Sequence, residues 1–304
     1  MLSFFCWNAA GCMHDIVPHA MGRSEPMRAI FLSDAHLRGE DADNYHFLLQ
    51  FFTDLQKEAE QQRKGRRDGS TLQRGEGEPP PLDALFLLGD FFDFWFAKGE
   101  RCYPGFERII RLIREIGETG VKIYLFEGNH DFFLDDYFAR GLGVTVHQDH
   151  ATIDLDGYRI YAAHGDLVDQ SNRGYLFLRK FLRSRFFYQL QRIIPSRLLW
   201  RIALVSSDTS KALWAQTGKM LTDKMCRFAL GLGEQGYDGI ILGHSHHPLV
   251  WAFSVSGEKK VLVTLGDWLT HRSYLEYSNR CFSMKYYKNE KLQDQSQPGE
   301  FCFE

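Results

Sequence analysis

The sequence predicts an α/β fold that carries a helical insertion, and two patterns support this prediction. In the first half of the chain, short apolar runs alternate with stretches of helical periodicity, which is typical of parallel βαβ units. In the second half, short strand-like runs are interrupted by a helical stretch over residues 167–237. The length of 304 residues allows one large domain or two modest ones.

The first expected strand covers residues 28–32, and apolar residues then recur at helical spacing from residue 45 to residue 55. Residues 56–81 are rich in charge, glycine and proline, so we expect them to extend this helix and then to form an exposed polar loop. Strands at 84–88 and 121–126 enclose a second helix over residues 109–116. This order predicts parallel neighbouring strands.

The later part of the chain is predicted to be richer in strands. Runs at 144–146, 151–155 and 158–163 come first, and Asp156-Gly157 fits a hairpin turn between the last two. After the helical stretch, strands are expected at 238–242, 249–255, 260–265 and 274–277. We expect one domain over residues 27–290, in which residues 167–237 form a helical cap. An N-terminal extension, either ordered or disordered, covers residues 1–26, and a C-terminal tail covers residues 291–304.

Composition excludes several classes of protein. The 44% apolar content excludes bulk disorder, and a net charge of −3 excludes a basic field over the whole surface. No run of 18 apolar residues is present, so we expect no membrane-spanning helix. The six cysteines are scattered, without a C-x-x-C pair, which is typical of a reduced, cytoplasmic chain.

Polar side chains follow five of the expected strands, at the end where open α/β sheets place their ligands. They are oxygen and imidazole donors, with no thiolate: Asp34, His36, Asp90, Asn129, His130, His164, His244 and His246. Such donors suit Mn, Fe, Zn or Mg. Each of these short motifs is common in proteins when it occurs alone. Together they provide too many donors for one ion, so they predict two ions that share a carboxylate.

The series DAH, GDFFD, GNHD, HGD and GHSH resembles the calcineurin-like metallophosphoesterase superfamily from residue 27 to about residue 277. The resemblance implies a β-sandwich flanked by helices, in four αββα layers, and two divalent ions. Mn²⁺ is the expected ion, with Fe²⁺, Zn²⁺ or Mg²⁺ as alternatives. Four residues would hold one ion: Asp34, His36, Asp90 and His246. Four would hold the other: Asp90, Asn129, His164 and His244.

The same resemblance assigns roles around the metals. His130 would protonate the leaving group or stabilise the transition state, and Asp131 would orient His130. Asp93 and Asp166 are expected to tie loops together rather than to bind metal. The resemblance thus predicts a hydrolase that acts on phosphoesters or pyrophosphates.

Residues 170–207 contain eight Lys and Arg and no acidic residue, interleaved with large apolar and aromatic side chains. This pattern is typical of basic amphipathic helices at a membrane surface. Two alternatives are helices that pack on the core with arginines in solvent, and a nucleic-acid surface, which the many aliphatic side chains disfavour. The pattern therefore favours an acidic amphiphile as the substrate.

The cap resembles that of the UDP-2,3-diacylglucosamine diphosphatases of lipid A biosynthesis, which implies a UDP-linked acylated sugar as substrate, with UMP and 2,3-diacylglucosamine 1-phosphate as products. The expected substrate contacts are Asn172, Arg173, Tyr175 and Lys211. The implied location is peripheral, on the cytoplasmic face of the inner membrane, with no nucleic-acid or protein partner. Alternatives are a metallophosphoesterase for nucleotides, phospholipids or phosphoproteins, and a non-catalytic membrane-associated scaffold.

Two residues depart from the pattern of that family. His130 follows the Gly-Asn pair where well-studied members have arginine, and Asn172 stands where an acidic residue is expected. Histidine at the first position is typical of general phosphodiesterases of the superfamily. These departures bear on the choice of substrate rather than on the chemistry.

Overall fold

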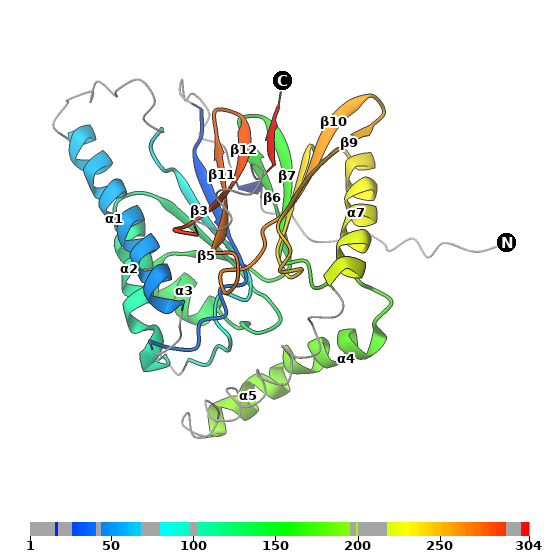
Figure 1. Ribbon diagram of the computed structural model, residues 1–304. Helices are drawn as coiled ribbons and strands as arrows, with labels where there is room; N and C mark the ends of the chain where they lie inside the picture. Colours follow the sequence, from blue (N-terminus) through cyan, green and yellow to red (C-terminus); the bar gives the residue numbers. More distant parts are fainter. Residues whose placement is uncertain are drawn as a thin grey trace.

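Two sheets stacked face to face form the centre of the protein (Figure 1). This computed structural model describes residues 16–17, 26–40, 44–67, 80–97, 102–194, 199, 218–289 and 299–303. The six-stranded sheet has the order β1 (Ile16–Val17), β6 (His150–Leu155), β7 (Tyr158–Ala163), β8 (Gly239–Leu242), β10 (Glu258–Thr264), β9 (Leu249–Val255). The seven-stranded sheet has the order β13 (Glu300–Cys302), β12 (Cys281–Tyr286), β11 (Ser273–Ser278), β2 (Ala29–Leu32), β3 (Ala84–Leu88), β4 (Lys122–Phe126), β5 (Thr145–His147).

The strands that end at the polar motifs are parallel neighbours within their sheets. β2, β3 and β4 pair in parallel in one sheet, and β7 pairs in parallel with β8 in the other. Helices or the other sheet cover both faces of these strands, which is why β2 and β3 are continuous apolar runs rather than alternating ones. Their carboxyl ends therefore deliver the motifs to one edge of the sandwich.

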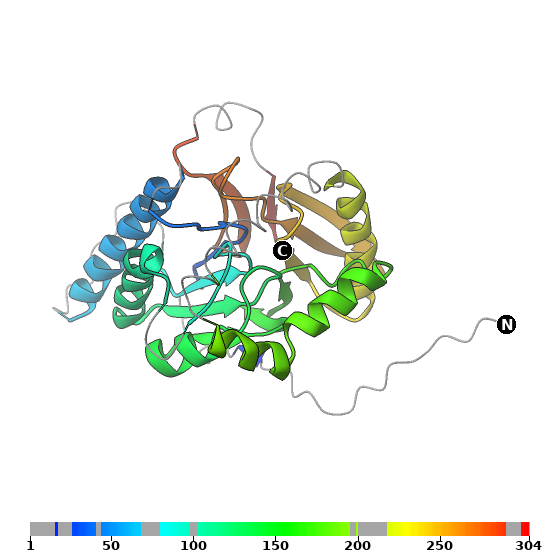
Figure 2. The same ribbon diagram turned by 90° about the horizontal axis from the view of Figure 1, so that it is seen from below.

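Helices cover the outer face of each sheet, which completes four layers (Figures 1 and 2). The short turn η1 (Pro104–Phe106) leads into α2 (Glu107–Glu118), which packs with α1 (Tyr45–Arg67) and α3 (Asp135–Leu142) on the seven-stranded sheet. α7 (Gly218–Glu234) packs on the six-stranded sheet. The predicted αββα sandwich is confirmed.

Successive side chains of β2 point alternately into two hydrophobic cores. Ile30 and Leu32 pack against the helices, whereas Phe31 points between the two sheets and stacks on Phe86 with 4.5 Å between ring centroids. α7 contributes Met225 to a third core on the far side of the six-stranded sheet. The sheets are thus held rigidly under the loops at their ends.

The helices α4 (Arg173–Leu182) and α5 (Arg185–Ile193) lie outside these layers, across the lower edge of the sandwich in Figure 1. The side chains of Asn172 and Ser184 cap them by accepting hydrogen bonds from the backbone N–H groups of Tyr175 and Phe187. Among the described residues, no helix combines the length and the apolar character needed to cross a bilayer.

Several elements differ from the prediction. β1, β12, β13 and α3 were not predicted from the sequence. Residues 16–17 of the extension and 300–302 of the tail pair as strands. α7 is a layer of the core rather than part of the cap, because its apolar side packs on β8 and β10. α1 continues to Arg67, and the rest of the predicted polar loop, residues 68–79, lies outside the described residues.

The cysteines also correct the prediction of a wholly reduced chain. Cys281 and Cys302 stand opposite each other on the antiparallel strands β12 and β13 and form a disulfide. Cys102 and Cys226 are free. Sequence spacing could not predict this bridge, because β13 follows a segment of residues with no strand pattern.

Candidate metal centre

The polar side chains predicted from the strand ends meet at one edge of the sandwich. They follow β2 (Asp34, His36), β3 (Asp90), β4 (Asn129, His130), β7 (His164) and β8 (His244, His246). Five of the eight are buried, and Asn129, His130 and His246 are partly exposed. The two sheets therefore contribute ligands jointly, as their parallel strand ends predict.

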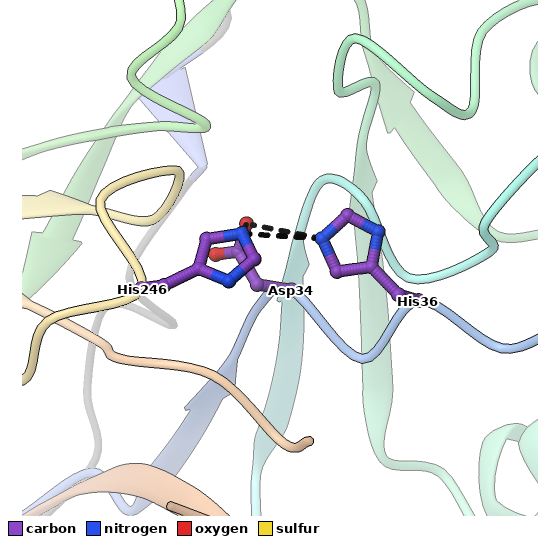
Figure 3. A group of neighbouring side chains, drawn as sticks. All are labelled: Asp34, His36 and His246. Atoms are coloured by element: carbon purple, nitrogen blue, oxygen red, sulfur yellow. Dashed lines mark hydrogen bonds and ion pairs between the residues drawn. The ribbon is translucent and has the colours of Figure 1, made fainter. Parts of the chain in front are cut away.

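The first cluster consists of Asp34, His36 and His246 (Figure 3). His246 Nε2 lies 3.3 Å from Asp34 Oδ1 and 3.2 Å from His36 Nε2, and the three side chains converge from two different sheets. Asp34 Oδ1 is buried and has no hydrogen-bond partner of good geometry among the residues that the structure describes. An oxygen of this kind, aimed at two imidazole nitrogens, fits a cation ligand.

The second cluster consists of Asn129, His164 and His244, which lie beside Asp90. His164 Nε2 is 3.1 Å from Asn129 Oδ1 and 3.1 Å from His244 Nδ1. The carboxylate of Asp90 completes the group, with its Oδ2 3.5 Å from His164 Nε2. These donors are again oxygen and nitrogen atoms without a thiolate.

One oxygen of Asp90 belongs to both clusters. Asp90 Oδ2 lies 3.8 Å from His36 Nε2 of the first cluster and 3.5 Å from His164 Nε2 of the second. The other oxygen, Oδ1, accepts the backbone N–H of His130 at 2.8 Å, which fixes the carboxylate. Asp90 is therefore placed to bridge two ions, and the donor set fits two divalent cations.

The backbone at these ligands adopts a conformation that most residues avoid. Five of them have φ in the left-handed region: Asp34, His36, Asp90, His244 and His246, with φ between 43° and 65°. Such angles cost free energy in residues with a Cβ atom, and they gather where a site over-determines them. The sequence analysis could not predict this feature, because the strain arises only once the loops are packed together.

Glycines beside the candidate ligands allow the loops to approach one another closely. A Cβ atom on Gly128 would lie 2.2 Å from Asp90 Oδ1, and one on Gly243 would lie 2.7 Å from Asp34 Oδ2. Any larger residue at these positions would displace a ligand carboxylate.

The electrostatics of the clusters are those of a cation site. Burial alone would raise the pKa of Asp90, but His164 and His130 hold it well below its ordinary value. Burial likewise opposes the charge of Asp34, and His246 lowers its pKa. Both carboxylates are therefore negative at neutral pH.

The pKa values of the histidines in the two clusters are shifted in opposite directions. Burial disfavours protonation, yet Asp90 raises the pKa of His164 to about 10 and Asp34 raises that of His246 to about 10. Burial and the neighbouring His164 lower the pKa of His244 to about 4, which keeps that ring neutral. The carboxylates thus attract positive charge strongly, and divalent ions can supply it while the imidazoles release their protons.

An acceptor oxygen lies beside the outer nitrogen of three of the four histidines in the two clusters. His36 Nδ1 lies 3.3 Å from Asp93 Oδ1, His246 Nδ1 lies 3.4 Å from Asp267 Oδ2, and His164 Nδ1 lies 3.0 Å from the carbonyl of Leu88. Such partners fix the tautomer and orientation of metal-binding imidazoles. No role was predicted for Asp267, although Gly266-Asp267 after β10 repeats the pattern of the other strand ends.

Replacing Asp267 with asparagine is expected to weaken metal binding about 10- to 100-fold, because the side chain keeps its shape but no longer holds His246 as a charged acceptor. Titration of the metal-free protein with Mn²⁺, followed by calorimetry, measures this. Asp135→Asn, an exposed acid at the start of α3, is the matched control. An Asp267 variant with the affinity of the control would contradict the positioning role.

Asp131 does not have the role expected of it. Its carboxylate accepts the backbone N–H groups of Asp90, Gly128 and Phe92 at 2.8 to 3.0 Å, so it holds the loops after β3 and β4 together. The ring of His130 is instead oriented by the carbonyl of Asp93, 3.2 Å from Nδ1. His130 Nε2 then faces Asp90, 4.0 Å from Oδ2.

Three of the predicted substrate contacts lie at the start of α4. The hydroxyl of Tyr175 donates to Asp166 Oδ2 at 2.7 Å, at the end of β7, so Tyr175 lies near the metal ligands. Asn172 caps α4, Arg173 is exposed at its first turn, and Lys211 lies outside the described residues. Burial and the Asp166 carboxylate raise the pKa of Tyr175, so its hydroxyl remains a donor.

Two arginines of the predicted cationic rim anchor the cap to the core. Arg179 Nε donates to Asp166 Oδ2 at 2.7 Å. Arg183 donates to Glu127 Oε2 at 2.8 Å and to the carbonyl of Gly128 at 2.7 Å, next to the ligand Asn129. These two arginines are mostly buried and paired with the core, so they do not face solvent as the packing alternative expects. They tie α4 to the loop that carries Asn129.

Comparisons with known proteins agree with this geometry. A family model described as calcineurin-like phosphoesterase matches residues 27–248. A protein of Photobacterium profundum named UDP-2,3-diacylglucosamine hydrolase is 28% identical over 82% of this chain and 92% of its own length. Proteins of the same name from Aeromonas salmonicida and Vibrio vulnificus are 29% and 27% identical, over 82% and 85% of this chain and 89% and 97% of their own lengths.

The family match covers all the ligand positions from Asp34 to His246. The two clusters that share Asp90 supply the donors that a metal-dependent hydrolase of this kind requires. The chain therefore belongs to the calcineurin-like phosphoesterase family.

Proposed function

We propose that the protein hydrolyses the pyrophosphate bond of UDP-2,3-diacylglucosamine, releasing UMP and 2,3-diacylglucosamine 1-phosphate, as a step of lipid A biosynthesis. The observation that carries this proposal is the position of the cap: Arg183 ties the apolar, basic helix α4 directly to the loop that holds Asn129. A phosphoester at the metals would thus lie beside a surface suited to acyl chains. The names of the similar bacterial proteins support the same substrate.

Two divalent ions would be held by the clusters that share Asp90, whose donors are carboxylates, imidazoles and one carboxamide. Mn²⁺ is the proposed ion among the several that such donors accept. When bound, such ions neutralise phosphoryl oxygens and lower the pKa of water. His130 would contribute the protein's own acid: its Nδ1–H donates to the carbonyl of Asp93, which orients the ring. The imidazolium, with a proton on both nitrogens, would then donate from Nε2 to the departing phosphate.

The cap would hold the acylated part of the substrate and bring the enzyme to the cytoplasmic face of the inner membrane as a peripheral protein. Six of the eight large exposed apolar side chains among the described residues lie on α4 and α5: Phe177, Leu178, Phe181, Phe186, Leu190 and Ile193. Arg173, Lys180 and Arg185 add positive charge on the same helices. This combination suits an acidic lipid surface.

The proposal is tested by comparing two substrates in detergent with Mn²⁺. UDP-2,3-diacylglucosamine is expected to be cleaved far faster than bis-p-nitrophenyl phosphate, because only the lipid contacts the cap as well as the metals. UMP release no faster than release of nitrophenol would contradict the proposal. That result would favour a general phosphodiesterase, the second candidate function, to which His130 in the GNHD motif points.

A further inference from the structure

A cavity of about 670 Å³ lies between α3, α5 and the loop at residues 95–97. None of the metal ligands lines it. Aromatic side chains form much of its wall, and Trp95 packs on Tyr137 while Phe133 packs on Tyr188, with ring centroids 5.2 and 4.8 Å apart. A cavity of this size can enclose part of a small organic molecule.

Two buried hydrogen-bond donors line this cavity without a partner. Trp95 is 4% exposed and Gln191 is 8% exposed, and neither Trp95 Nε1 nor Gln191 Nε2 has a hydrogen-bond partner among the described residues. A buried N–H group without an acceptor costs free energy, so such groups are uncommon. An acceptor from outside the described residues would satisfy both groups.

The charges around the cavity favour an anionic acceptor. Three arginines from three helices line it: Arg114 of α2, Arg140 of α3 and Arg192 of α5. One carboxylate opposes them, that of Asp136, which pairs with Arg140 and accepts a hydrogen bond from Tyr188. Two positive charges therefore remain, and guanidinium groups match the oxygens of a phosphate well.

The helix α5, which lines the cavity, also carries exposed apolar side chains. α5 lines the cavity with Tyr188, Gln191 and Arg192, and the same helix exposes Leu190 and Ile193 to solvent. A ligand with a phosphate head and an apolar body can therefore place its head in the cavity and its body along α5.

We propose that this cavity, which we call the arginine cavity, binds the phosphate group of an amphiphile at a position separate from the metal centre. Arg114 and Arg192 pair with the phosphate oxygens, and Trp95 Nε1 and Gln191 Nε2 donate to them. A phospholipid head group and free phosphate share this chemistry, and titration separates them.

The test measures binding to the metal-loaded, full-length protein by calorimetry, with dihexanoyl phosphatidylglycerol in one arm and inorganic phosphate in the other. Removing both guanidinium groups in Arg114→Ala/Arg192→Ala is expected to weaken binding of the lipid at least about tenfold, because charge-assisted hydrogen bonds are lost. Arg108→Ala/Arg111→Ala removes two exposed arginines of α2 that lie outside the cavity and is the matched control.

Gln191→Leu provides a second variant. It is expected to weaken lipid binding about threefold, yet to keep or raise Tm because it removes a buried amide without a partner. Phosphate that binds with the same dependence on Arg114 and Arg192 would support the cavity and identify a free anion as its ligand. Lipid and phosphate binding that is absent, or equal in the double variant and the control, would overturn the proposal.

Discussion

Replacing Asp90 with alanine is expected to abolish metal binding and to lower turnover by at least about a thousandfold. Asp90 Oδ2 lies close to both clusters, so its loss would remove a ligand from each ion and the electrostatic stabilisation that two ions provide, which is worth several kcal/mol. Metal content by mass spectrometry and hydrolysis of bis-p-nitrophenyl phosphate measure the two effects.

Asp90→Asn controls for folding, because asparagine can still accept the backbone N–H of His130 through its side-chain oxygen. This variant should keep the Tm of the parent and still lose most of its activity, whereas Asp135→Ala should change neither property. An Asp90 variant that retains two ions and most of the turnover would contradict a bridging carboxylate.

The second large effect is expected at the exposed face of the cap. Phe177 is 75% exposed and Ile193 is 80% exposed, and burying such a side chain in a bilayer contributes about 1.5–3 kcal/mol. Changing both to glutamate should therefore reduce binding to anionic vesicles, and hydrolysis of the lipid substrate within them, by at least about a hundredfold.

The matched control for the cap is Met220→Glu, because Met220 is 66% exposed but lies on α7, on the opposite side of the six-stranded sheet from the interior. Hydrolysis of bis-p-nitrophenyl phosphate should be unchanged in all these variants, since the metal ligands are intact. Vesicle binding that equals that of the control would assign α4 and α5 a structural role only.

The parts of the fold and site that are encoded locally could be predicted from the sequence. Asp34-x-His36 and His244-x-His246 follow apolar strands within a few residues, so their place at the ends of β2 and β8 follows from the sequence pattern. The bridging role of Asp90 came from the family resemblance, and its contacts with both clusters agree with it.

The parts that depend on contacts between distant segments could not be predicted. Asp131 lies next to His130 in sequence, but its oxygens point to backbone N–H groups of the β3 loop, and a carbonyl from that loop orients the histidine instead. Asp267 meets His246 only because β10 and β8 pair in parallel. Periodicity also could not separate the cap from α7, because both are amphipathic helices.

The proposed function is tested most directly by mass spectrometry of the products formed from UDP-2,3-diacylglucosamine, with metal content measured on the same sample. Equimolar UMP and 2,3-diacylglucosamine 1-phosphate, formed by protein that carries two divalent ions and not by Asp90→Ala, is the predicted result. Intact substrate, or release of uridine diphosphate in place of UMP by protein loaded with two ions, would contradict it.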